Sequence, residues 1–143
     1  MVRLIERRRA AYERFEPVFW RRAPGAARRT ALFYRLLLLR RSTTALVASD
    51  EGGVTGFLIA RRTPVPPVYD PGGPTVTVDD FAVGGAEQWG SIGGALLDRL
   101  REVARAAGWR QIVVVCGAED RAKSDLLRAG DLHVVSTWWT ATL

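Results

Sequence analysis

The chain has 143 residues, of which 48% are hydrophobic and 25% charged, and its formal net charge is +6. This balance is typical of a folded globular protein, and we predict a single domain over residues 1–143. No apolar run reaches the ~20 residues that span a bilayer, so a membrane-spanning protein is not expected.

Positive charge is concentrated at the start of the chain. Residues 1–41 contain twelve Arg and three Glu, whereas residues 42–143 contain nine basic and twelve acidic residues. An Arg-rich segment can bind nucleic acid or an anionic surface. It can also be the solvated face of amphipathic helices, which we favour because apolar residues recur there at helical spacing. In a third interpretation, compatible with both, the basic groups attract an anionic cofactor or an acidic substrate.

Residues 1–41 are predicted to form a pair of helices that precedes a core over residues 42–143. The first helix covers Arg3 to about Trp20 and is kinked or broken near Glu16 by Pro17. The second runs from about Ala26 to Arg41. Its expected inward residues are Ala31, Phe33, Tyr34, Leu37 and Leu38.

A hairpin and a long loop follow the helices. Thr44–Ala48 and Val54–Arg61 are predicted strands, joined by a turn at Asp50–Gly53. Thr63–Pro74 contains five prolines, which forbid a regular strand ladder, and it is predicted to be a loop. Because long loops on compact domains are often functional, we expect it to cover one side of the functional site.

A Gly-rich turn joins a strand at Val76–Val83 to a helix at Ser91–Ala107. The first N–H groups of a helix are unpaired, and backbone approaches a phosphate closely where no Cβ intervenes. The turn lacks both the Gly-x-x-x-x-Gly-Lys-Ser/Thr pattern of a triphosphate loop and the Gly-x-Gly-x-x-Gly of a dinucleotide fold. It is therefore a candidate phosphate site, with an ordinary tight turn as the alternative.

The last part of the chain predicts a strand, a helix and a closing strand. Gln111–Cys116 is a continuous β-branched run, which is typical of a central parallel strand. Asp120 caps a helix that ends at Ala129-Gly130. Leu132–Leu143 is then expected to close the sheet.

Three kinds of residue in this part have simple structural interpretations. Of the adjacent Trp138 and Trp139, one is expected in the core and the other at the surface or in a homodimer contact. Cys116 is the only cysteine and cannot form an internal disulfide, which indicates a reducing cytoplasm. One histidine, His133, and one cysteine far apart in sequence do not make a metal site.

Two adjoining segments resemble a known superfamily. Gln88-Trp89-Gly90-Ser91-Ile92-Gly93 is similar to the Gln/Arg-x-x-Gly-x-Gly/Ala signature of the GNAT superfamily of acyl-CoA-dependent N-acyltransferases. Val78–Val83 looks like the fourth strand of that superfamily. Ser91 stands where the first Gly of the signature is usual, a change that a small, helix-capping side chain tolerates. The resemblance covers about residues 42–143.

The resemblance implies an α/β fold with a mixed, mostly antiparallel central sheet and helices on both faces. A splayed parallel strand pair would hold acetyl-CoA, the cosubstrate, without a metal. Main-chain groups of the strand would pair with pantetheine, and the turn would bind the pyrophosphate. The implied cofactor-binding residues are Phe81, Ala82, Val83, Gln88, Trp89, Gly90, Ser91, Ile92, Gly93 and Gly94.

The resemblance also implies direct attack of a primary amine, from a small molecule or a peptide, on the thioester. The general base in this family is often an acid on the fourth strand, which makes Asp79 and Asp80 the candidate catalytic residues. Successive strand residues face opposite sides, so only one is expected to reach the acceptor. Leu126 stands where the family commonly has a Tyr acid, and Glu119 where it often has Asn. A CoA-binding module without catalysis therefore stays open, as does, less favoured, a nucleic-acid-associated protein.

Overall fold

The computed structural model describes residues 1–64 and 68–143, and it contains one sheet with helices on both faces. The elements are α1 (Val2–Phe15), α2 (Ala26–Leu38), β1 (Thr43–Asp50), β2 (Gly53–Thr63), β3 (Thr75–Val83), a 3₁₀ turn (Ala86–Gln88), a π turn (Trp89–Gly93), α3 (Gly94–Ala106), β4 (Gln111–Val114) and α4 (Arg121–Ala129). Within these described ranges, no helix is both long enough and apolar enough to cross a membrane.

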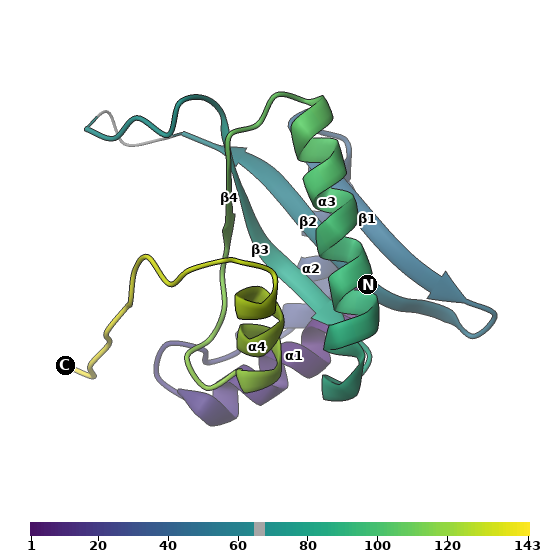
Figure 1. The fold of residues 1–143 in the computed structure, drawn as a ribbon. Coiled ribbons are helices and arrows are strands. Elements are labelled where there is room, and N and C mark those ends of the chain that lie inside the picture. Colours follow the sequence, from purple (N-terminus) through teal and green to yellow (C-terminus); the bar gives the residue numbers. More distant parts are fainter. Residues whose placement is uncertain (65–67) are drawn as a thin grey trace.

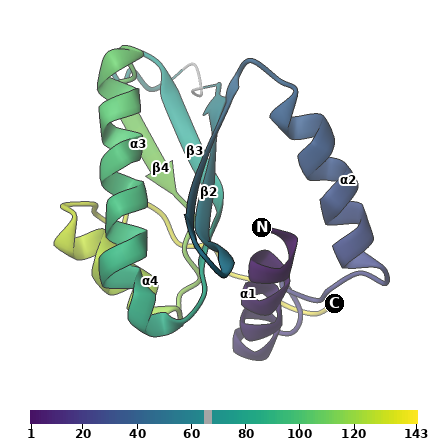
Figure 2. The ribbon, with the colours of Figure 1, turned by 90° about the vertical axis from the view of Figure 1, so that its right-hand side faces the viewer.

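The sheet has the order β1-β2-β3-β4. The first two pairs are antiparallel and the pair β3–β4 is parallel. Helices α1 and α2 lie on one face, and α3 and α4 on the other, which Figure 2 shows edge-on. The predicted α/β fold with a mixed, mostly antiparallel sheet is confirmed.

Two apolar clusters hold these layers together. Phe57 and Ile59 of β2 face α1 and α2, where Leu4 and Tyr34 are buried with them. The alternate residues of β2, Leu58 among them, face α3 on the other side. This period of two is what a strand covered on both faces requires.

A β-bulge interrupts β3 at the two acidic residues. Ile59 pairs with Asp80 and Ala60 with Val78, so Asp79 is an extra residue without a partner on β2. Val78 and Phe81, three residues apart, consequently face the same apolar cluster. Strict alternation therefore does not hold between Val78 and Phe81, because a bulge locally changes the direction of side chains. The expectation that only one of Asp79 and Asp80 reaches the acceptor stays a prediction.

The first two helices differ from the prediction in detail. α1 ends at Phe15, not Trp20, since Glu16 is extended ahead of Pro17, and the break expected near Glu16 is confirmed. Val2–Ile5, which the family pattern could have used as a first strand, is helical.

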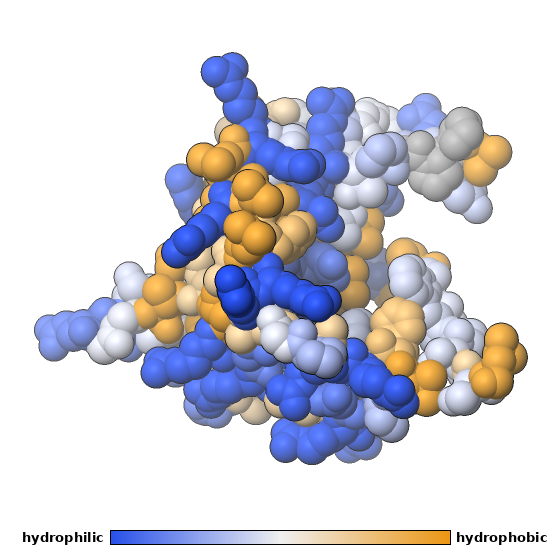
Figure 3. Space-filling view, turned by 180° about the vertical axis from the view of Figure 1, so that it is seen from behind, coloured by the Kyte–Doolittle hydropathy of each residue, from blue (hydrophilic) through white to orange (hydrophobic). Residues whose placement is uncertain are grey.

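The buried side of α2 is narrower than we predicted. It is the stripe Thr30, Tyr34 and Leu37, at helical spacing, whereas Phe33 and Leu38 are exposed. Exposed leucines of α2 form part of the apolar area seen from behind the molecule in Figure 3. The residue types alone could not separate the two sides, because both sides of this helix are apolar.

The largest difference from the prediction concerns the end of the chain. β4 ends at Val114 and pairs only with β3, so it is an edge strand rather than a central one. Residues 131–143 form no strand, and the expected closing strand is absent from the described chain. After α4, Asp131 takes a left-handed conformation (φ 57°), and the chain leaves the body of the molecule (Figure 1).

Candidate active site

The two parallel strands separate half-way along β3. Val76 and Val78 lie opposite Ile112 and Val114, and the last bond runs from Val115 N–H to the Val78 carbonyl at 2.9 Å. β3 continues to Val83, while the chain after β4 turns away towards α4. Beyond the bulge, β3 therefore has no strand partner on this side among the described residues. An open strand edge of this kind can pair with the amides of an extended ligand.

The Gly-rich turn lies at the end of this open strand. Gly84 and Gly85 lead into the 3₁₀ turn, so helical backbone begins at Ala86 and not at the predicted Ser91. A π turn follows, and the N–H of Gly94 is shared between the carbonyls of Ser91 and Trp89. Such wide turns are frequent at functional sites. The start of this long helical stretch provides the positive dipole end that an anion needs. The N–H groups of Gln88 and Trp89 already donate to the carbonyls of Gly85 and Ala86.

The residues predicted to bind the cofactor fall into a buried and an exposed group. Phe81 and Trp89 are buried and meet edge-to-face, with ring centroids 4.8 Å apart. Gly93 is also buried: a Cβ there would lie 2.7 Å from the Trp89 ring and 2.9 Å from Leu126. By contrast, Gly90 and Ser91 are exposed. In this structure Trp89 and Gly93 serve packing, and the surface open to a ligand is at Gly90 and Ser91.

The other predicted residues of this group lie between these extremes. Ala82 is buried under α1, and Val83, Ile92 and Gly94 are half-buried. The side-chain carbonyl of Gln88 is buried without a hydrogen-bond partner among the described residues. Gln88 folds back over Gly84, where a Cβ would be 2.5 Å from this oxygen.

Asp80 is the better placed of the two candidate bases. It is half-buried beneath α1 and α2, with the Arg9 guanidinium 3.7 Å away. Burial raises the pKa of Asp80, and the neighbouring Asp79 raises it further, against the opposing effect of Arg9. Asp79, at the bulge, is exposed. A carboxyl with a raised pKa holds a proton more readily than an ordinary one, which suits a general base.

Side chains from α1 and α4 meet where β3 and β4 separate. The Tyr12 hydroxyl accepts a hydrogen bond from Gly117 N–H at 2.9 Å and donates to Asp120 at 3.0 Å. Arg8 forms an ion pair with the same carboxylate at 2.5 Å, and both charged side chains are only 12% exposed. Asp120 also accepts from the N–H of Lys123 and so caps α4, as predicted.

Lys123 lies at the centre of this cluster and is fully buried. Its ammonium donates to the Val115 carbonyl at 2.6 Å and lies 5.2 Å from the centre of the Phe81 ring. Burial, together with the nearby Arg8 guanidinium, lowers the pKa of Lys123 to about 7. Lys123 can therefore give up a proton near neutral pH, which an arginine in its place could not do.

Cys116 follows the end of β4 and is half-buried beside the same cluster. Burial raises the pKa of its thiol, so it is less acidic than a free cysteine. Its surroundings are those of a small apolar residue. Among the described residues no group of three or more His, Cys, Asp or Glu is arranged to hold a metal.

Arg8, Tyr12 and Lys123 were not predicted as site residues. One signal was present: Lys123 is the only lysine in a chain whose other 20 basic residues are arginines, and it stands four residues before the buried Leu127. A lone lysine on the apolar side of a helix is a candidate for a shifted pKa. Tyr12 had no such signal, because its partners come from 105 and 108 residues further along the chain.

The basic helix α1 lies against the Gly-rich turn. Arg7 donates to the Gly84 carbonyl at 2.7 Å, and the Arg8 guanidinium lies 5.0 Å from the Trp89 ring centre. Arg9 interacts with Glu6 and Thr30 as well as with Asp80. Part of the N-terminal positive charge thus lies beside the candidate anion site, in line with our third interpretation of that charge.

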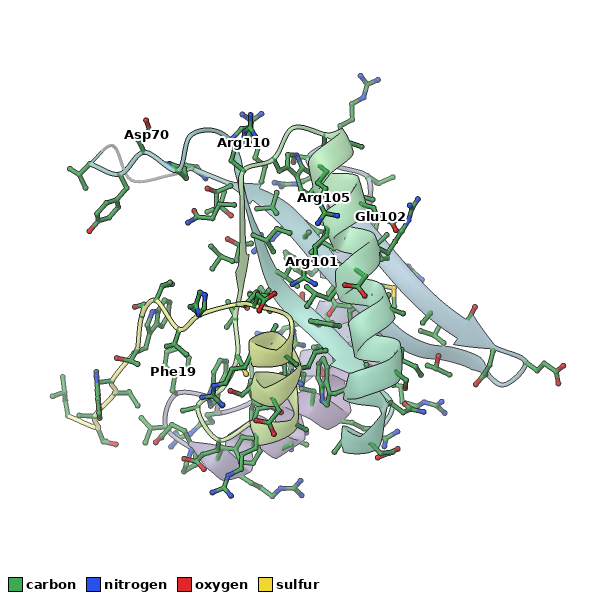
Figure 4. The ribbon with its side chains drawn as sticks, in the orientation of Figure 1. Phe19, Asp70, Arg101, Glu102, Arg105 and Arg110 are labelled. Carbon is green, nitrogen blue, oxygen red and sulfur yellow. The ribbon has the colours of Figure 1, made fainter. Side chains whose placement is uncertain are left out.

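The described part of the predicted loop over Thr63–Pro74 does not lie beside this cluster. Residues 65–67 are outside the described part of the chain. Residues 68–74 lead into the start of β3, whereas the Gly-rich turn follows its end. Figure 4 shows Asp70 of this loop far from α4. The described part of the loop therefore does not cover the site.

Comparison with solved structures identifies the fold. A tetramutant of a protein from Bacillus halodurans superposes with a TM-score of 0.81 at 16% identity, over 99% of this chain and 91% of its own. The chain has the fold of the GNAT acetyltransferases. No protein-family model and no curated protein sequence gives a significant match.

Two other proteins of similar structure are acetyltransferases. A ribosomal-protein-alanine N-acetyltransferase from Brucella melitensis biovar Abortus 2308 has a TM-score of 0.57 at 23% identity, covering 78% of this chain and 75% of its own. An aminoglycoside N-acetyltransferase in complex with CoA has a TM-score of 0.65 at 14% identity, covering 81% and 87%. At these identities the similarity establishes the GNAT fold, and activity has to be argued from the site.

Proposed function

We propose that this protein is an acetyl-CoA-dependent N-acyltransferase that acylates a primary amine. The observation that carries the proposal is the separation of β3 from β4 directly beside a Gly-rich helix start. The acetyltransferase activity of its fold neighbours supports it, and one of them holds CoA. The same two features explain how a long, anionic cofactor with amide groups would fit.

The cofactor would bind along the open half of β3 and end at the turn. Main-chain groups of Phe81–Val83 would pair with the pantetheine amides. The dipole of this helical stretch and its exposed backbone at Gly90 and Ser91 would hold the pyrophosphate. Arg7, which reaches Gly84, adds positive charge at this end. No metal is needed for any of these contacts.

The acyl transfer would use two proton-carrying groups on opposite sides of the thioester. The amine attacks the thioester carbonyl, so that a C–N bond forms and the C–S bond breaks. Asp80 takes the proton lost by the amine, directly or through a water. Lys123, charged at the start, gives its proton to the departing CoA thiolate and so replaces the missing Tyr at Leu126. Binding both reactants in one site would supply much of the rate through proximity.

A second candidate is a CoA-binding module without catalysis. It is favoured by Leu126, which packs against Gly93 and offers no proton to a leaving group. It is also favoured by the full burial of Lys123 between aromatic rings. The two candidates share the cofactor site and differ only in turnover.

Calorimetric titration with acetyl-CoA tests the proposal, with free CoA and ATP as competitors. We expect saturable binding of acetyl-CoA well ahead of ATP in the wild type. Ser91→Glu should weaken this binding strongly, because it places a negative charge on the exposed part of the turn. Ser42→Glu is the matched control, since Ser42 is also exposed and lies before β1, outside the turn. Equal acetyl-CoA affinity in both variants would contradict the assignment of the cofactor site to this turn.

Release of free thiol in the presence of primary amines separates the two candidates. The enzyme should release CoA in an amine-dependent manner, and Asp80→Asn should slow turnover more than Asp79→Asn. Acetyl-CoA binding without turnover on any amine would favour the non-catalytic module instead.

A further inference from the structure

β4 has the sequence of an internal strand but lies at the edge of the sheet. Ile112, Val113 and Val114 form a continuous β-branched run, and all three are half-buried. Such runs normally lie between two neighbours, because an apolar edge strand invites pairing with another chain. Nothing in the described chain covers the outer side of β4, so one neighbour is missing.

The outward-facing groups of β4 are identified by its bonds to β3. The N–H groups of Gln111 and Val115 point inward, to the carbonyls of Pro74 and Val78. Because successive N–H groups of a strand point to opposite sides, those of Ile112 and Val114 point outward. These two residues offer main-chain hydrogen bonds to an added strand.

The end of the chain has the complementary property. Leu132–Leu143 is rich in β-branched and aromatic residues, yet it pairs with no strand of the described chain. Val135 is 83% exposed and Trp139 93%. Its aromatic contact with the rest of the chain is between Trp138 and Phe19, whose ring centroids are 6.0 Å apart. In Figure 1 the segment runs out beyond the body of the molecule.

A groove beside β4 offers room for side chains of an added strand. Its volume is about 630 Å³, and it lies between α3, the start of β4 and residues 130–132. Leu97, Ala104, Trp109 and Ile112 provide its apolar lining. Arg101, Glu102, Arg105 and Arg110, labelled in Figure 4, form its polar rim.

We propose that two copies of the protein exchange their C-terminal segments, so that residues 132–143 of each pair with the open edge of β4 of the other. Besides the edge at β1 and the open half of β3, each copy has the outer edge of β4 and a strand-like segment that pairs with no strand of the described chain. A two-fold arrangement pairs the edge of β4 with this segment in both copies. The twelve residues extend over ~40 Å, whereas the outer side of β4 needs only about 15 Å. The remaining length is enough to cross from one copy to the other. Alternate side chains of the segment would then enter the groove.

Two variants each remove one part of the proposed contact, either the open edge of β4 or the exchanged segment. Val114→Pro removes an outward N–H and keeps the inward bonds to β3, which is where an edge strand tolerates proline. Val114→Thr is its matched control, because it keeps both the donor and the β-branched shape. A chain ending at Asp131 lacks the exchanged segment but has an intact edge.

Sedimentation velocity over a wide concentration range measures the result. We expect the wild type and Val114→Thr to be dimers, and Val114→Pro and the shortened chain to be monomers. Mixed together, the last two should form a 1:1 dimer, since one supplies the segment and the other the edge. Circular dichroism of each variant reports whether it folds, and its acetyl-CoA binding reports whether the cofactor site is intact. Neither measurement depends on association.

Three outcomes would overturn the proposal. One is a monomeric wild type, including one whose C-terminal amides are protected from hydrogen exchange because the segment folds back on its own β4. Another is a dimer that survives Val114→Pro. The third is failure of the two monomeric variants to associate. If Val114→Pro does not fold, interchain nuclear Overhauser contacts between labelled and unlabelled wild-type copies decide whether residues 132–143 lie on the partner's β4.

Discussion

The two sides of the β4 segment contrast sharply. On the inner side, where the chain after β4 leaves β3, side chains of α1 and of the start of α4 form a connected cluster beside the opening: Arg8, Tyr12, Asp120 and Lys123. On the outer side, the described part of the chain provides no strand partner for an equally apolar strand. If the proposed exchange takes place, the residues of the candidate active site come from one copy, whereas the sheet is completed by another.

Among changes to the cluster on the inner side, Asp120→Ala should reduce the stability of the protein most. This change leaves the Arg8 charge unpaired in a nearly buried place, and removes both the Tyr12 partner and the cap of α4. We expect a loss of about 3 kcal/mol in the free energy of unfolding, measured by urea denaturation. Asp120→Asn should cost less because it keeps a hydrogen-bond acceptor. Glu102→Ala, which breaks an exposed ion pair with Arg99, is the control and should change little.

Lys123 should make the free energy of unfolding depend on pH. In the folded state burial lowers its pKa from 10.5 to about 7, while Cys116, Asp120 and Asp79 act in the opposite direction. Between these two values the unfolded chain binds a proton that the folded chain does not. The free energy of unfolding therefore rises with pH from about 7 towards 10, by up to ~1.4 kcal/mol per pH unit.

Lys123→Met isolates this contribution, because every other titrating group stays in place. The difference in the free energy of unfolding between wild type and Lys123→Met should change with pH in the sense just given. It is measured by urea denaturation at a series of pH values. A difference that stays constant from pH 7 to 10 would mean that Lys123 remains charged when folded.

Two glycines of the turn differ in their surroundings, since Gly93 is tightly packed and Gly90 is exposed. Gly93→Ala places a methyl group against Trp89 and Leu126, and should cost about 1–3 kcal/mol of stability by overpacking. Gly90→Ala meets nothing within 4 Å and should be neutral or slightly stabilising. Thermal unfolding of the two variants measures this. Equal melting temperatures would show that the contacts of Gly93 do not matter.

Features that depend on a local pattern could be predicted from the sequence, and features that depend on contacts between distant segments could not. The strand, the Gly-rich turn and the helix after it are local patterns, and they were predicted nearly in place. The bulge at Asp79 could not be predicted, because it depends on the register with β2. Tyr12 and Lys123 meet only through tertiary packing. The closing strand at Leu132–Leu143 was wrong for a different reason: a strand-like pattern indicates that a segment can pair, but not with which chain.

Trp139→Ser is expected to have a small effect on the free energy of unfolding of a single copy. It also tests the proposed contact at the outer edge of β4. In a single copy Trp139 is almost fully exposed, so its loss should change the free energy of unfolding by less than about 0.5 kcal/mol at high dilution. If residues 132–143 pair with a second copy, the same change removes a buried aromatic side chain from that contact. Its cost should then grow with protein concentration, because association stabilises the folded state by mass action. Denaturation of wild type and variant at several concentrations distinguishes these cases. A cost that is small at every concentration would place Trp139 outside any contact, and a large cost at high dilution would place it within its own copy.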